Sequence, residues 1–130
     1  MAFVGSDRIS SSAVLQEDSA GYFMYVVTCS DGSLYTGYTR DVERRVAQHN
    51  DGTGAKYTRA HGPVTLRAQA RFATQHEALS AEYRFKRLAR ADKLALIARA
   101  EECRRTDSLS AEQAFARVLS EAFGLSEDTG

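Results

Sequence analysis

The chain has 130 residues and no net charge, with 43% hydrophobic and 26% charged residues, which are the proportions of one globular domain. The longest uncharged apolar run lies near Tyr22–Cys29, far short of the roughly 20 residues of a membrane helix, and no secretion signal opens the chain. The two cysteines are distant and form no CxxC pair, so they give no metal motif. Because the chain has neither a membrane helix nor a secretion signal, we expect a cytoplasmic protein with no membrane partner.

Charge is distributed unevenly along the chain. Residues 40–93 carry twelve basic and six acidic side chains, whereas residues 1–39 carry one basic and four acidic, and residues 94–130 carry four and seven. A basic segment of this kind can attract a polyanion even in a neutral protein. A solvated, arginine-rich surface is the other interpretation, and charge alone does not decide between them.

The predicted elements begin after residue 20. Residues 1–20 are rich in Ser and Ala without a sustained period and are expected to form a flexible leader. Tyr22–Cys29 is dense in aromatic and β-branched residues, which predicts a strand. Leu34–Tyr38 predicts a second strand, and the turn at Ser30–Ser33 joins the two into a hairpin.

A helix and a third strand are predicted next. Thr39 or Asp41 can cap the helix, which is expected to end at residues 50–52. Residues 51–62 are polar and contain glycine, which predicts a loop. Val64–Phe72 alternates apolar and polar side chains, the pattern of a half-buried strand.

The remainder of the chain is predicted to be helical. Thr74 and Glu77 match a capping box that opens a helix reaching about Arg90, and a shorter helix covers Lys93–Glu102. Ser110 caps a last helix with apolar residues at helical spacing. The order β-β-α-β-α, followed by one or two helices, predicts an α+β sandwich.

Glu82 is the first candidate for a functional side chain. It falls within the apolar stripe of the helix predicted from Thr74, where a carboxylate is unfavourable unless it is paired, hydrogen-bonded or bound to metal. Lys86 lies four residues further on, so an ordinary helix ion pair explains Glu82 equally well. Hard divalent ions favour carboxylate oxygen, which makes Glu82 the candidate metal ligand.

Arg45 and His49 are spaced four apart on the first predicted helix and point the same way. An arginine can hold a phosphate oxygen, and a histidine can orient a phenol or share its proton. A solvated arginine and a structural histidine are the more common outcome for such positions. Strand packing would likewise account for the four tyrosines of the hairpin, which are Tyr22, Tyr25, Tyr35 and Tyr38.

Two short segments of the hairpin resemble the motifs that give the GIY-YIG nuclease family its name. Phe23-Met24-Tyr25 lies where the family has Gly-Ile-Tyr, and Tyr35-Thr36-Gly37 lies where it has Tyr-Ile-Gly. The resemblance covers about residues 21–98. Within the family, the chain is most similar to the small single-domain bacterial members. It implies a three-stranded antiparallel sheet flanked by helices, here followed by a C-terminal helical extension over residues 99–130.

The spacing of the other candidates follows the same family pattern. Arg45 and His49 follow Tyr35 by ten and fourteen residues, and Glu82 occupies the place of the family's metal-binding glutamate. The resemblance implies an endonuclease that hydrolyses phosphodiester bonds in nucleic acid, DNA rather than RNA, with one Mg²⁺ or Mn²⁺ ion. Tyr35 would be the general base, Arg45 would steady the phosphate and Glu82 would hold the ion. Tyr25 and His49 would complete the hydrogen-bonded shell, and whether His49 or the ion assists Tyr35 stays open.

Other basic side chains are expected to bind the nucleic-acid backbone without reading its sequence. No reader domain is recognisable, so specificity would come from nucleic-acid shape or from a protein partner. The expected backbone-binding residues are Arg40, Arg44, Lys56, Arg59, Arg67, Arg71, Arg84, Lys86 and Arg87.

The chain departs from the family pattern at several positions. Phe23 replaces a glycine and Thr36 an isoleucine, and the only asparagine is Asn50, whereas many members have one after the glutamate helix. This departure motivates an alternative, a non-catalytic nucleic-acid-binding module on the same fold. A third hypothesis is an interaction protein that docks through its last helix, although core packing explains that helix more simply.

The loop of the hairpin decides whether the two tyrosines can share a site. A two-residue Asp31-Gly32 loop pairs residue 25 with 38 and places Tyr25 and Tyr35 on opposite faces of the sheet. A three-residue loop that also includes Ser30 pairs residue 25 with 37 and places them on one face. We predict the three-residue loop, with Gly32 in the left-handed region, or a bulge with the same effect.

Overall fold

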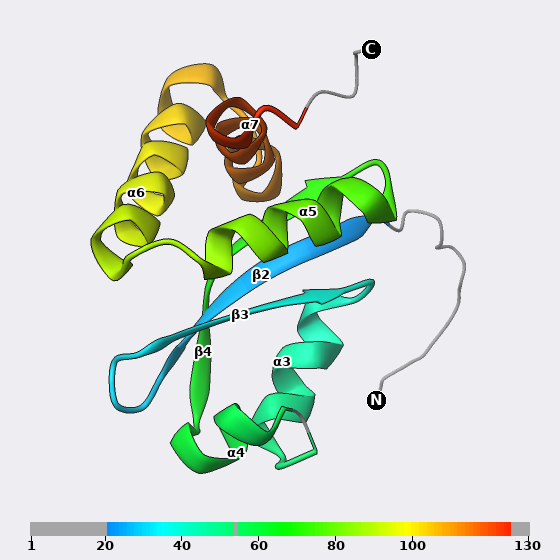
Figure 1. The fold of residues 1–130 in the computed structure, drawn as a ribbon, viewed down its shortest axis with the longest axis vertical. Coiled ribbons are helices and arrows are strands. Elements are labelled where there is room, and N and C mark those ends of the chain that lie inside the picture. The colour runs from blue at the N-terminus through cyan, green and yellow to red at the C-terminus, as the bar shows by residue number, and fades with distance from the viewer. Residues whose placement is uncertain (1–20, 54, 126–130) are drawn as a thin grey trace.

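The computed structural model describes residues 21–53 and 55–125 (Figure 1), so the expected leader at 1–20 lies outside the described residues. A β-hairpin is followed by two helices, a third strand and three further helices. The elements are β2 (Tyr22–Cys29), β3 (Leu34–Thr39), α3 (Val42–Asn50), α4 (Lys56–His61), β4 (Val64–Phe72), α5 (Gln75–Lys86), α6 (Arg90–Asp107) and α7 (Ala111–Phe123).

The three strands form one antiparallel sheet in the order β3-β2-β4. Figure 1 shows α5, α6 and α7 on one side of the sheet and α3 with α4 on the other. This arrangement confirms the predicted α+β fold with a three-stranded antiparallel sheet. No helix in residues 21–53 and 55–125 has the length and apolar character needed to cross a membrane.

The hairpin has the predicted three-residue loop. Tyr25 pairs with Gly37 and Thr28 with Leu34, so Tyr25 and Tyr35 project from the same face of the sheet. The Cys29 amide donates to the Ser33 carbonyl at 2.8 Å, which closes the loop. Gly32 has φ 87°, a conformation that glycine adopts without a Cβ clash.

Each face of the sheet is covered by its own hydrophobic core. On the face to which Met24 and Val26 point, the Met24 face, the strands pack against α5, α6 and α7, with Phe85 and Phe115 in edge-to-face contact at 5.8 Å. On the opposite face, the Tyr25 face, the smaller core consists of Tyr25, Val27, Cys29, Val42 and Val64, with Phe23, Tyr35 and Val46 packed against it.

Strand β4 contributes to both cores, which the predicted alternation did not anticipate. Val26 pairs with Ala68 but Val27 pairs with Leu66, so Arg67 is an extra residue that forms a β-bulge. The bulge reverses the orientation of the side chains along the strand. Val64 therefore packs in the Tyr25-face core, whereas Phe72 packs in the Met24-face core.

The predicted loop at residues 51–62 was wrong, because it contains helix α4. This helix has only six residues and no side-chain cap at Ala55, so no periodic or capping signal marks it. Its stability comes from tertiary packing, since Thr58 is fully buried and Tyr57 stacks on neighbouring rings. At α3, Asp41 is the cap and accepts a hydrogen bond from the Arg44 amide at 3.1 Å.

The boundaries of the next helices also differ from prediction. Helix α5 begins at the predicted capping box but ends at Lys86, because Ala89 adopts an extended conformation. The Arg87 and Leu88 amides bond carbonyls three residues back, which tightens the last turn. Good helix-forming residues on both sides conceal this break in the sequence. Helix α6 begins at Arg90 and is longer than the predicted Lys93–Glu102, while α7 begins after Ser110 with the expected capping box.

We expect the last helix to be part of the cooperative fold. Phe115 is 1% exposed in the Met24-face core, so Phe115→Ala should lower the free energy of unfolding by about 3–5 kcal/mol. Denaturant unfolding followed by circular dichroism measures this, with Leu79→Ala at a 40% exposed position of α5 as the control. A loss as small as the control's, or a separate second transition, would contradict this packing.

Candidate active site

Tyr25 extends its ring from β2 across Gly37 of the edge strand β3. A Cβ atom at position 37 would lie 2.5 Å from the Tyr25 hydroxyl oxygen and 2.7 Å from the ring Cζ. Such distances are far below van der Waals contact, so only glycine leaves room for the ring. The glycine of the Tyr35-Thr36-Gly37 segment thus has a defined physical role, which is to let Tyr25 lie flat over its partner strand.

The hydroxyl of Tyr25 begins a buried chain of hydrogen bonds. It lies 2.8 Å from Nε2 of His49, a residue of α3 that is only 2% exposed. Nδ1 of His49 lies 2.6 Å from Oγ1 of Thr58 on α4, and this hydroxyl donates to the Ala55 carbonyl at 2.9 Å. Both nitrogens of His49 are therefore occupied within the protein.

Burial sets the charge state of both rings. The pKa of Tyr25 is raised by burial, an effect that a hydrogen bond and the positive charge of Arg45 oppose and that Tyr35 and Glu82 reinforce. The pKa of His49 is lowered, first by burial and then by the charge of Arg45. At neutral pH a protonated phenol therefore faces a neutral imidazole, a pairing that buries no charge.

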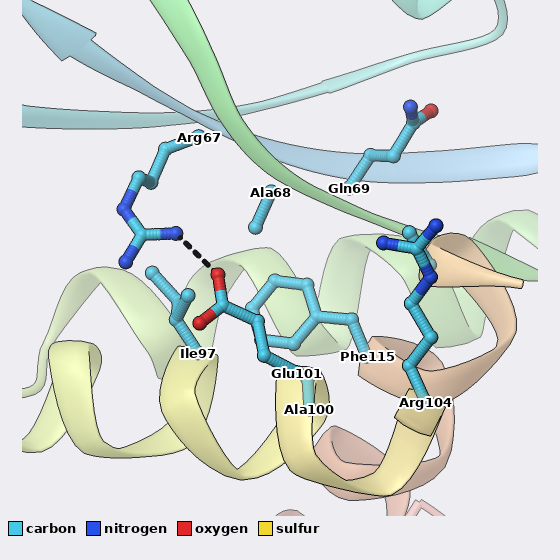
Figure 2. Close-up of a pocket in the computed structure, with 9 residues that line it drawn as sticks. Arg67, Ala68, Gln69, Ile97, Ala100, Glu101, Arg104 and Phe115 are labelled. Carbon is cyan, nitrogen blue, oxygen red and sulfur yellow. Dashed lines mark hydrogen bonds and ion pairs between the residues drawn. The ribbon is translucent and has the colours of Figure 1, made fainter. Parts of the chain in front are cut away.

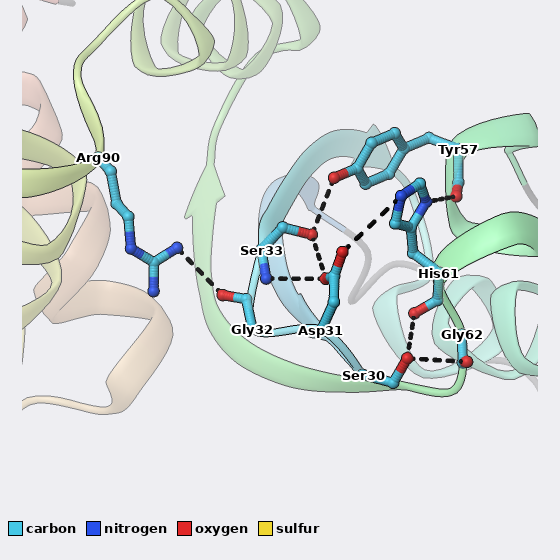
Figure 3. Close-up of polar contacts among 8 residues, drawn as sticks. All are labelled: Ser30, Asp31, Gly32, Ser33, Tyr57, His61, Gly62 and Arg90. Carbon is cyan, nitrogen blue, oxygen red and sulfur yellow. Dashed lines mark hydrogen bonds and ion pairs between the residues drawn. The ribbon is translucent and has the colours of Figure 1, made fainter.

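Tyr35 lies beside this pair and begins a row of aromatic rings. Its ring meets His49 edge to face at 5.4 Å, and its other neighbour is Tyr57 of α4, stacked at 5.9 Å. Tyr57 in turn stacks on His61 at 4.0 Å. Figure 3 shows Tyr57 and His61 held by the hairpin turn, through a bond from the Tyr57 hydroxyl to Ser33 and an ion pair of His61 with Asp31. Sequence reasoning missed Tyr57 because α4 itself was missed.

Arg45 lies half-buried on α3 at the edge of this cluster. Its guanidinium donates to Gln48 at 3.1 Å, and its charge reaches both Tyr25 and His49. An open depression beside it is lined by three arginines and four polar residues. These are Tyr38, Thr39, Arg40, Asp41, Arg44, Arg45 and Gln48. Concentrated positive charge in an open depression suits a phosphate group.

Glu82 lies on α5, the helix that covers the Met24 face. Its side chain is 20% exposed and lies 3.5 Å from the Lys86 ammonium group, so the helix ion pair considered from the sequence is present. Lys86 is 54% exposed, and such a pair is weak. The Glu82 carboxylate is also close enough for its charge to raise the pKa of Tyr25.

The predicted backbone-binding arginines lie in different places. Arg40 donates to the Gly21 carbonyl at 2.9 Å and stacks on Tyr22, so it also holds the start of β2. Arg67 pairs with Glu101 at 2.9 Å over a pocket between β4, α6 and α7 (Figure 2), and no tyrosine lines this pocket among the described residues. The remaining candidates on described elements are exposed; they are Arg44, Lys56, Arg59, Arg71, Arg84, Lys86 and Arg87.

Two departures from the family pattern have structural explanations. The Asn50 amide bonds both backbone groups of Val64, accepting from its N–H at 2.6 Å and donating to its carbonyl at 3.0 Å, which anchors β4 to α3. Asn50 is therefore a structural residue. Thr36 packs at a buried position where the family has isoleucine, and its hydroxyl has no hydrogen-bond partner among the described residues.

The fold and this cluster define a class of protein: a small α+β domain whose hairpin tyrosines meet an arginine and a histidine from the following helix. A family model described as the GIY-YIG catalytic domain matches residues 21–95, and the chain belongs to this family.

Several relatives are similar over the same region. A UPF0213 protein of Halobacterium salinarum is 59% identical over 75 residues, which are 58% of this chain and 97% of the relative. A UPF0213 protein of Bacillus licheniformis is 51% identical over 76 residues, 58% of this chain and 78% of the relative. The solved structure of a UPF0213 protein from Bacillus halodurans is 46% identical, with a TM-score of 0.41 over 60% of this chain and 83% of that one.

Stability should depend on pH through His49. Because burial holds its pKa below the ordinary value of about 6.5, the unfolded chain takes up this proton first as pH falls. The contribution of His49 to the free energy of unfolding is therefore complete above about pH 6.5 and is lost as pH falls below that value. Urea unfolding between about pH 8 and pH 5 measures the slope.

The matched control for this measurement is the exposed histidine of α5. His49→Asn should flatten part of the acid slope, whereas His76→Asn should leave it as in the wild type. An unchanged slope in His49→Asn would show that the histidine is not held neutral.

Proposed function

We propose that the protein is a metal-dependent endonuclease that hydrolyses phosphodiester bonds in nucleic acid, with DNA the preferred substrate. The observation that carries this proposal is the contact of Tyr25 and Tyr35 with the buried ring of His49, which also lies within reach of the charge of Arg45. A tyrosine, an arginine and a carboxylate can supply the general base, the stabilising positive charge and the metal ligand that metal-assisted hydrolysis of a phosphodiester uses. Membership of the GIY-YIG family supports the same reaction.

Tyr35 is the proposed general base. Tyr25 is unsuited to that role, because its hydroxyl is committed to His49 and burial keeps it protonated. His49 is unsuited as well, since Tyr25 and Thr58 occupy its two nitrogens. Tyr35 is half-buried and contacts His49 through its ring, so His49 orients Tyr35 and does not take its proton. To accept the proton of the attacking water, Tyr35 would act as the phenolate, after losing its own proton to bulk water; the positive charge of Arg45 and of a bound metal ion would favour that form.

Arg45 and Glu82 are proposed to act on the phosphate. Arg45, beside an open depression lined by Arg40 and Arg44, would bind a non-bridging oxygen and stabilise the charge that develops there. The Glu82 carboxylate, which is paired with the exposed Lys86, would hold a Mg²⁺ or Mn²⁺ ion, since both ions favour carboxylate oxygen. Such an ion, when bound, would neutralise phosphate charge and stabilise the leaving oxygen.

Cleavage of labelled single-stranded, duplex and branched DNA with Mg²⁺ or Mn²⁺ tests the proposal. We expect wild type to cut, and both Tyr35→Phe and Glu82→Gln to lose at least about a hundredfold in rate, because each removes a group that acts at the phosphate. Glu102→Gln, an exposed carboxylate on α6, is the matched control and should cut as wild type does.

The same assay separates the second candidate function, a non-catalytic nucleic-acid-binding module. The observation that favours it is the structural use of Asn50, which leaves no asparagine for the role that many family members have. Salt-sensitive binding without cleavage in wild type, unchanged in Tyr35→Phe and Glu82→Gln, would replace the endonuclease proposal with this one.

A further inference from the structure

Helix α4 carries a buried hydroxyl group directly beneath the site. The Thr58 side chain is fully buried, with its Oγ1 2.6 Å from His49 Nδ1 and 2.9 Å from the Ala55 carbonyl oxygen. Thr58 touches neither Tyr35 nor Arg45 through a hydrogen bond in the described part of the chain. Any effect it has on the reaction must therefore pass through His49.

The two contacts of Thr58 fix the direction of the whole hydrogen-bond chain. A hydroxyl group has one proton, and that proton is donated to the Ala55 carbonyl, which has no proton of its own to give. The Thr58 oxygen can then only accept from His49, so the single proton of the neutral imidazole lies on Nδ1. Nε2 is left as an acceptor, and the Tyr25 hydroxyl donates to it.

We propose that Thr58 is a positioning residue whose oxygen holds His49 in the Nδ1–H tautomer and thereby makes the Tyr25 hydroxyl the donor to Nε2. With its proton directed to His49, the Tyr25 oxygen presents its lone pairs to the rest of the site. In the opposite tautomer, Nε2–H would donate to the Tyr25 oxygen, and the phenol proton would point away from His49. Thr58 thus decides whether Tyr25 faces the site as a hydrogen-bond acceptor or as a donor.

Two substitutions distinguish the effect of the Thr58 oxygen from the effect of the side-chain shape. Thr58→Val keeps the branched shape but removes the acceptor, whereas Thr58→Ser keeps the acceptor. The tautomer of His49 is read from the ¹⁵N chemical shifts of its ring in the full-length protein at neutral pH, without substrate or metal. We expect Nδ1–H in wild type and Thr58→Ser, and Nε2–H or a mixture in Thr58→Val.

Cleavage kinetics give the second readout, and this part rests on the proposed function. We expect Thr58→Val to lower kcat on the order of tenfold to a hundredfold with KM little changed, because the residue acts through His49 and does not touch substrate. Thr58→Ser should restore most of the rate. A purely structural role would lower stability in Thr58→Val without moving the tautomer, and urea unfolding of both variants measures that loss.

The prediction for the His49 tautomer and the prediction for the cleavage rate can fail independently of each other. A wild-type His49 with its proton on Nε2 would overturn the proposal, and this measurement needs no variant to fold. A Thr58→Val protein that retains Nδ1–H, or that cuts at the wild-type rate, would overturn it too. If wild type cuts no DNA, the endonuclease proposal fails, while the Nδ1–H tautomer in wild type and its loss in Thr58→Val would still support the role of Thr58 in orienting His49.

Discussion

The pairing of Tyr25 with Gly37 is the constraint on which the rest of the site depends. A loop one residue shorter would turn Tyr35 to the other face of the sheet, and any side chain at position 37 would occupy the space of the Tyr25 ring. With this register, both tyrosines reach the ring of His49 from the same face. The register of the hairpin, the absence of a side chain at Gly37 and the contact of both tyrosines with His49 therefore depend on one another.

The site is organised around groups that stay neutral because they are buried. An ionised His49 beneath the sheet would be unfavourable beside Arg45, and an ionised Tyr25 would be unfavourable in the Tyr25-face core. Satisfying both rings with hydrogen bonds requires a partner below the histidine, and α4 supplies it as Thr58. Charge is thereby left to the less buried side chains of Arg45 and Glu82.

Sequence reasoning predicted the elements that local turn and capping residues specify, and it missed those that depend on tertiary contacts. The loop length and Gly32 were predictable from turn chemistry, and the capping boxes of α5 and α7 marked their starts. Helix α4 has six residues without a cap, so only burial of Thr58 reveals it. The bulge at Arg67 leaves no trace in an alternating pattern, because each half of β4 alternates correctly. The family resemblance named Tyr25, Tyr35, Arg45, His49 and Glu82 as a set, but it could not indicate the hydrogen-bond chain that fixes their orientation.

The substitution Gly37→Ala tests the central claim most directly, because it changes the geometry around Tyr25 and replaces no side chain of the proposed site. The measurement is the nuclear Overhauser contact between the Tyr25 and His49 rings, recorded together with DNA cleavage and the circular dichroism of the folded chain. We predict that the added methyl group displaces Tyr25, removes the contact and abolishes cleavage while the secondary structure remains. A folded Gly37→Ala protein that keeps the ring contact and cuts at the wild-type rate would contradict the account.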